Sequence, residues 1–168
     1  FDEAVELFQQ VLADKPDYHE IHNNLSYVYE RVGRFDEAVA AARRAIELQP
    51  EYAEGCNNLG TALKSLRRLD EACDCFRQAL QLQPDFPLAE FNLGTTLLLE
   101  GDLKAGWPGY DRRGETLEIR PADYGKPRWD GSSLNGKTIL LYAEQGFGDV
   151  IQFIRYAAVV KELGGSVI

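Results

Sequence analysis

Asparagine recurs at one position every 34 residues, as Asn24, Asn58 and Asn92, each directly before a leucine. A primary amide offers N–H donors and a carbonyl acceptor, and the backbone of an extended peptide offers the same groups at regular intervals. A ladder of these amides therefore suits a bound polypeptide. The same amides can instead tie one helix to its neighbour, and the sequence leaves both roles open. The residues that we expect to line the same groove are Tyr27, Thr61 and Thr95.

A second candidate site is the loop Glu144-Gln145-Gly146-Phe147-Gly148-Asp149, which lies between an apolar run and a predicted helix. The free amides of a helix N-terminus are suited to an anion or a sugar hydroxyl, so Gly146 and Gly148 are candidates for a substrate loop. Aspartate is a favoured residue at the start of a helix, and Asp149 is expected to cap this one.

Residues 131–138 satisfy the phosphate-loop pattern G-x-x-x-x-G-K-[ST], but their context argues against a nucleotide site. That loop needs a buried strand before it and a helix after it, so that helix amides face the phosphates. Here a proline-containing stretch precedes the first glycine and an apolar, strand-like run follows Lys137. We therefore expect no ATP or GTP site.

The elements that would position the asparagines follow the same period, which is marked by Pro16, Pro50 and Pro84. Residues 19–32 show helical spacing of apolar side chains, and a second predicted helix runs to Pro50. Gly33 is expected to end the first helix, as is Gly101 two repeats later, while Arg67 stands at this place in the middle copy. A single pair of helices cannot bury its apolar stripe, so the pairs must stack.

This period and pattern resemble the tetratricopeptide repeat over about residues 1–113. The resemblance implies a mainly α fold, a right-handed superhelix of helix hairpins with a concave face. The repeat boundaries that it implies are 1–18 for a partial copy, then 19–52, 53–86 and 87–113. The Asn-Leu-Gly or Asn-Leu-Ser steps are similar to the ladders of O-linked N-acetylglucosamine transferases, which hold substrate polypeptide.

The second part of the chain has a different pattern. Residues 114–137 are rich in proline and glycine and are predicted to form an irregular connector, with Trp129 as its anchor. Residues 138–143 are continuously apolar, as in a strand buried on both faces, and are followed by a predicted helix over 150–163 and the start of another strand at 166–168. Residues 138–168 are therefore predicted to begin an α/β domain as a truncated β-α-β unit.

Motifs within residues 106–168 resemble the start of the catalytic domain in bacterial proteins that fuse such repeats to a heptosyltransferase-like glycosyltransferase. They include Pro127-x-Trp129-x-Gly131 and Gly146-x-Gly148-Asp149. The resemblance implies an inverting transfer from a nucleotide-sugar donor, with Asp149 as general base. We expect this chain itself to be catalytically inert and to need no cofactor, because the donor lobe of such enzymes is not included. The donor would bind the full-length parent.

Composition limits the partners. With 18 Lys and Arg against 27 Asp and Glu, the formal charge of −9 disfavours nucleic acid and anionic membranes. No apolar run reaches the roughly 20 residues of a membrane span, and we expect a cytoplasmic protein. Cys73 and Cys75 point to different faces of a helix, so no metal site is expected. The apolar faces of the truncated unit are expected to need cover, from the repeats or by self-association.

Three functions follow from these patterns. The first is a protein-interaction module that binds a polypeptide or a partner protein in the concave groove, with the chain itself non-catalytic. The second is the amino-terminal part of an active glycosyltransferase. The third is a structural spacer without a ligand in its groove.

Overall fold

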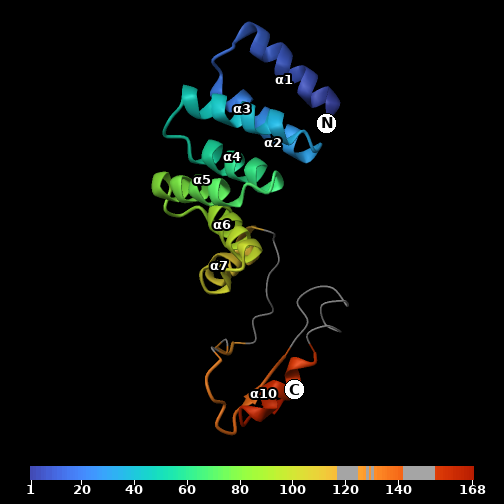
Figure 1. Cartoon of the computed structure of the whole chain (residues 1–168), viewed down its shortest axis with the longest axis vertical. Helices are drawn as coiled ribbons and strands as arrows, with labels where there is room; N and C mark the ends of the chain where they lie inside the picture. The colour runs from blue at the N-terminus through green and yellow to red at the C-terminus, as the bar shows by residue number, and fades with distance from the viewer. Residues whose placement is uncertain (117–124, 128, 130, 142–153) are drawn as a thin grey trace. The chain divides into compact units, whose positions relative to one another are not determined.

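The computed structural model describes residues 1–116, 125–127, 129, 131–141 and 154–168. The chain forms two units, residues 1–119 and residues 120–168 (Figure 1). The predicted connector, 114–137, is divided between them.

Unit 1 is a series of helices that pack in pairs along the chain. The first helices α2, α4 and α6 pack on the second helices α3, α5 and α7 of their own pairs, and α1, α3 and α5 pack on the first helix of the next pair. Figure 1 shows these pairs following one another as a stack. The helices are α1 (Asp2–Asp14), α2 (His19–Arg31), α3 (Phe35–Leu48), α4 (Ala53–Ser65), α5 (Leu69–Leu82), α6 (Pro87–Glu100), α7 (Leu103–Tyr110) and α8 (Arg113–Thr116). The mainly α, paired-helix fold predicted for this region is confirmed.

The turn after each first helix needs a left-handed backbone residue. Gly33 and Gly101 adopt φ of +79° and +92° there, and glycine accepts this conformation without strain because it has no Cβ. In the middle repeat Arg67 takes the same place with φ of +62°. The turn geometry is therefore kept in all three repeats, and in one of them a side chain that disfavours it is forced into it.

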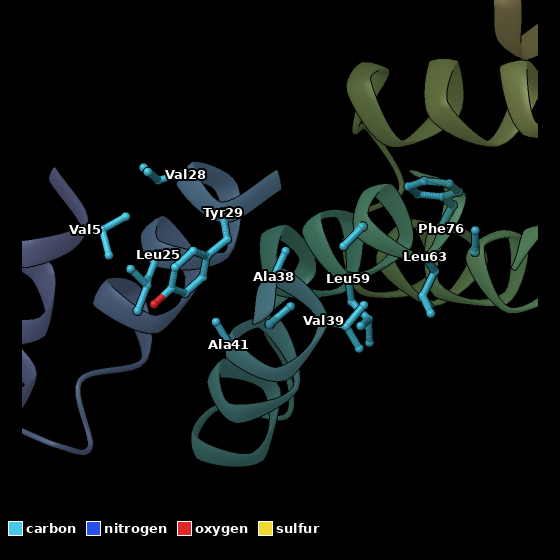
Figure 2. Close-up of a cluster of buried hydrophobic side chains, with 13 residues drawn as sticks. Val5, Leu25, Val28, Tyr29, Ala38, Val39, Ala41, Leu59, Leu63 and Phe76 are labelled. Carbon is cyan, nitrogen blue, oxygen red and sulfur yellow. The ribbon is translucent and has the colours of Figure 1, made fainter. Parts of the chain in front are cut away.

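The core of unit 1 runs from α1 to α5 and consists of aliphatic, alanine and aromatic side chains, including Val5, Leu25, Val39, Leu63 and Phe76 (Figure 2). Small residues on the first helices let the second helices approach closely. A Cβ on Gly60 would lie 2.6 Å from the ring of Phe76.

The third repeat shows the tightest contact between two helices of one pair. A Cβ on Gly94 would lie 2.5 Å from the backbone nitrogen of Tyr110 and 2.7 Å from the carbonyl oxygen of Gly106. Ser26 occupies the equivalent place in the first complete repeat, and its hydroxyl donates to the carbonyl of Ala38 at 2.8 Å. The recurring Asn-Leu-Gly and Asn-Leu-Ser steps therefore place a small residue where the two helices of a pair are in close contact.

The predicted irregular stretch from residue 114 onwards is wrong at its beginning, because Arg113–Thr116 form the short helix α8. Arg112 fixes this turn. Its guanidinium pairs with Glu90 of α6 at 2.6 Å and with Glu115 at 3.0 Å, and Glu115 is three residues further on. These ion pairs hold a helical turn that the glycine at position 114 alone does not favour.

Unit 2 contains β1 (Thr138–Ile139), α10 (Tyr156–Glu162) and β2 (Ser166–Val167) in its described part, and β1 pairs with β2 in parallel. Of the strand predicted over 138–143, Thr138–Ile139 are observed as a strand. Residues 142–143 and the start of the helix predicted over 150–163 lie outside the described residues. Leu140 and Leu141 are exposed rather than buried on both faces, although the amide of Leu141 donates to the carbonyl of Ile168 at 2.9 Å. The described residues therefore do not establish the predicted α/β lobe, and self-association through it stays a prediction.

Two further expectations concern the loop before β1. Lys137 leads directly into a strand and not into a helix, so the context that a phosphate-binding loop needs is absent at this point. The indole of Trp129 donates to the carbonyl of Ser132 at 2.8 Å, a local contact within the loop.

The turn at Arg67 yields a stability prediction. Replacement of Arg67 by glycine relieves the left-handed strain, and although glycine loses more backbone entropy on folding, we expect a gain of about 0.5–1 kcal/mol in the free energy of unfolding. The reverse substitution at the equivalent turn, Gly33→Ala, should lose a similar amount. Urea unfolding monitored by circular dichroism measures both, and a destabilised Arg67→Gly variant would contradict the strain argument.

Candidate functional site

The recurring asparagines form hydrogen bonds from one repeat to the next. The side-chain nitrogen of Asn58 donates to the side-chain oxygen of Asn23 at 2.8 Å. The side-chain nitrogen of Asn92 donates in the same way to the side-chain oxygen of Asn57 at 2.9 Å. Asn57 and Asn92 are buried, and Asn23 is buried as well. Two asparagines per repeat therefore build one amide ladder, in which each link joins residues 35 positions apart.

The ladder lies where the first helices of successive pairs meet. α2 contacts α4 and α4 contacts α6, so these three helices form one face of unit 1, called here the first-helix face. A polar group that is buried in such a contact needs a hydrogen-bond partner, because an unpaired amide would lower the free energy of unfolding by about 1–3 kcal/mol. The structure thus supports the interhelix role for the amide nitrogens of Asn58 and Asn92.

Lys64 is a further polar residue on this face. Its ammonium donates to the side-chain oxygen of Asn92 at 3.3 Å and to the hydroxyl of Thr95 at 3.5 Å. Burial lowers the pKa of Lys64, and the nearby carboxylate of Glu30 acts in the opposite direction. Glu30 in turn accepts a hydrogen bond from Ser65 at 3.1 Å. A partly desolvated cation is therefore held between α4 and α6.

The predicted site residues differ in how much of their side chain is accessible. Asn24 and Tyr27, both on α2, are exposed. Thr61 is half-buried, and its hydroxyl donates to the carbonyl of Asn57 at 3.0 Å. Thr95 is also half-buried and donates to the carbonyl of Asn92 at 2.9 Å. All six predicted residues thus come from α2, α4 and α6, the helices of one face.

Two parts of this site were not predicted as such. The sequence shows Asn23 and Asn57 as extra amides, but their role as the acceptors of the ladder depends on how the pairs stack. Lys64 was missed, although it lies six residues after Asn58 and therefore within two helical turns on the same helix. Its counterparts one repeat away are Glu30 and Leu98, so the repeat pattern gave no signal for a cation.

The second predicted site cannot be placed in the same way. Gly146, Gly148 and Asp149 lie outside the described residues. Their proposed roles, as a substrate loop and a general base, stay predictions.

The cysteines behave as packing residues. Cys56 and Cys73 are buried and Cys75 is half-buried, and all three are free. Burial raises the pKa of Cys75 to about 11, so its thiol is protonated at neutral pH. Among the residues that the structure describes, no group of three His, Cys, Asp or Glu side chains is placed to hold a metal ion.

The repeats of this chain resemble those of a known family. Two models of the family described as Tetratricopeptide repeat match residues 1–53 and 53–86. No curated protein matches the chain. None of the matched families or structures supports a fused glycosyltransferase domain.

Several solved structures share the fold. A structure of MamA from AMB-1 is 30% identical, covers 68% of this chain and 68% of its own, and has a TM-score of 0.56. A second crystal structure of MamA is 22% identical over 71% of this chain and 70% of its own, with a TM-score of 0.62. MamA residues 41 to the end from Desulfovibrio magneticus RS-1 are 18% identical over 72% and 68%, with a TM-score of 0.61.

No helix in the described part of the chain combines the length and the apolar character that crossing a bilayer requires.

The ladder yields a prediction that separates its structural role from ligand binding. Replacement of Asn57 by alanine leaves the buried amide of Asn92 without its acceptor, and we expect a loss of about 1–3 kcal/mol in the free energy of unfolding. Asn24→Ala, at an exposed asparagine, is the matched control and should change stability by less than about 0.5 kcal/mol. Chemical denaturation of both variants, of Asn92→Ala and of the Asn57→Ala/Asn92→Ala double variant measures the coupling. Equal, small effects at both positions would contradict the ladder.

Proposed function

Because this chain belongs to the tetratricopeptide repeat family, we propose that it is a protein-interaction module that binds an extended polypeptide along its first-helix face. The observation that carries this proposal is a row of polar side chains on α2, α4 and α6, with one set in each repeat. The side-chain nitrogens of Asn58 and Asn92 form hydrogen bonds between repeats, while other polar groups of the row stay accessible.

The accessible groups match the needs of a peptide backbone. Asn24 presents its amide and Tyr27 its phenol on exposed side chains of α2. The hydroxyl of Thr61 uses its proton on the carbonyl of Asn57, and its oxygen keeps acceptor capacity for a peptide N–H. Thr95 on α6 is half-buried, so α2, α4 and α6 each present at least one partly accessible polar group, and an extended main chain needs both donors and acceptors.

Lys64 supplies the charged group of this face. An ammonium has three N–H donors, and two of them are directed to Asn92 and Thr95. The third can be donated to a carbonyl or carboxylate oxygen of the ligand. Because burial disfavours the charged amine, a ligand oxygen that replaces lost water would be bound strongly.

The sequence also predicted two other functions. A binding experiment distinguishes the first of them, a spacer without a ligand, from the interaction module. The link to glycosyltransferases stays a sequence-based prediction, and titration of the full-length parent and its Asp149→Asn variant with nucleotide sugars would test it.

Binding is tested on a peptide array from which the strongest ligand is then titrated by calorimetry. Asn24→Ala and Tyr27→Ala should each weaken binding of that peptide about three- to tenfold, since each removes one exposed contact, with little change in stability. Lys64→Met should weaken it at least tenfold. Because the substitution removes the cost of burying a charge but also the donor to the side-chain oxygen of Asn92, urea unfolding of the same variant separates lost binding from lost stability.

Gln78→Ala is the matched control, because Gln78 is exposed on α5, outside the first-helix face. Its affinity for the peptide should equal that of the unmodified chain. If no peptide binds, the spacer function is favoured. If a peptide binds and Gln78→Ala weakens its binding as much as Tyr27→Ala does, the first-helix face is not the binding surface.

A further inference from the structure

The turn that leads into β1 contains an asparagine followed by a glycine. The amide of Lys137 donates to the carbonyl of Leu134 at 2.9 Å, which closes a turn over 134–137. Its central residues, Asn135 and Gly136, have φ of +46° and +81°. Positive φ at both central positions is typical of a type I′ turn, in which Asn-Gly is a preferred pair. Every other asparagine of the chain is followed by leucine or by a second asparagine, so Asn135 alone precedes a residue without a side chain.

An asparagine in this position can react with its own backbone. The nitrogen of Gly136 forms a bond to Cγ of Asn135, the bond between Cγ and Nδ2 breaks, and ammonia leaves with the proton of the attacking nitrogen. Water then opens the cyclic imide at either of its carbonyls and gives aspartate or isoaspartate. The reaction consumes only water and releases only ammonia. Glycine hinders the attack least, because it carries no Cβ.

The side chain of Asn135 is exposed, and its carbonyl is polarised by a neighbour. The hydroxyl of Ser133 donates to Oδ1 of Asn135 at 2.9 Å. Negative charge develops on this oxygen when a nucleophile adds to Cγ, and a hydrogen-bond donor stabilises that charge. Ser133 therefore favours the addition step.

The attacking nitrogen is restrained by the neighbouring segment. Its N–H donates to the carbonyl of Gly164 at 2.7 Å, and the amide of Leu134 donates to the carbonyl of Leu163 at 3.2 Å. Leu134 is buried, and a Cβ on Gly165 would lie 2.3 Å from its side chain. Hydrogen bonds and packing therefore hold the turn on residues 163–165. The nitrogen is released when this contact opens locally.

We propose that Asn135 is a site of spontaneous deamidation, and that its rate is set by how often the contact between residues 134–137 and 163–165 opens. The two products differ in their effect. Aspartate retains the turn, because aspartate accepts the left-handed backbone as asparagine does. Isoaspartate adds a methylene group to the backbone before Gly136, which moves the amide of Gly136 away from Gly164 and weakens the pairing of β1 with β2.

Mass spectrometry of the full chain tests the site. Trypsin cleaves after Arg128 and Lys137 and releases residues 129–137 as one peptide. After incubation at mildly alkaline pH, we expect this peptide to gain the mass of one amide-to-acid conversion at Asn135 and to separate into aspartyl and isoaspartyl forms. Asn24 is the internal control. It is exposed as well, but it lies within α2 and precedes leucine, so it should stay unchanged.

A pair of variants tests the role of opening. Gly165→Ala places a Cβ against Leu134 and loosens the contact, so it should raise the hydrogen exchange of the Gly136 amide and the deamidation rate at least about fivefold. Glu162→Ala, at an exposed residue of α10, is the matched control and should change neither rate. A series of urea concentrations below unfolding opens the contact without a substitution, which keeps the test valid if Gly165→Ala does not fold.

Each of three results would overturn the proposal. If Asn135 gains no mass while a synthetic peptide of residues 129–137 deamidates under the same conditions, the site is excluded. If the full chain deamidates as fast as that peptide, the contact does not restrain the reaction. If Gly165→Ala speeds exchange at Gly136 without speeding deamidation, opening does not set the rate.

Discussion

The stacking of helix pairs is the constraint on which unit 1 depends. The second helices α3 and α5 each have two apolar faces, one covered by the first helix of their own pair and the other by the first helix of the next pair. A pair by itself leaves one of these faces in water, so stability grows with each neighbour that is added. Close packing at Gly60 and Gly94 brings the helices near enough for this burial, and it leaves no space for a larger residue there.

Polar groups are built into this apolar stack at defined places. The amides of Asn57 and Asn92 are buried and bonded to each other, which fixes how one pair is placed on the next, because a shifted pair would leave both unpaired. Lys64 shows the cost of such a group, since burial lowers its pKa although Glu30 is near. An apolar residue would pack at this position without that penalty.

Differences between otherwise equal repeats carry the specific properties of this chain. Arg67 keeps a turn that glycine makes elsewhere, Phe91 ends the amide ladder, and Trp107 places an indole where the core has Val39 or Cys73. Because the repeats follow a strict period, each of these three residues differs in type from its counterparts at the same structural position in the other repeats. Two of the three lie in the last repeat, where α7 is also shorter than α3 and α5.

The sequence by itself determined the period, the paired helices and their ends, since helix spacing and turn residues such as Gly33 act over a few neighbouring positions. It also placed Asn58 and Asn92 on one face, while leaving their role open. Only the tertiary structure decided that Asn23 and Asn57 accept their bonds and that Lys64 is partly desolvated. These properties arise between residues 28 to 35 positions apart, brought together by stacking, and no local pattern records which side chains meet there.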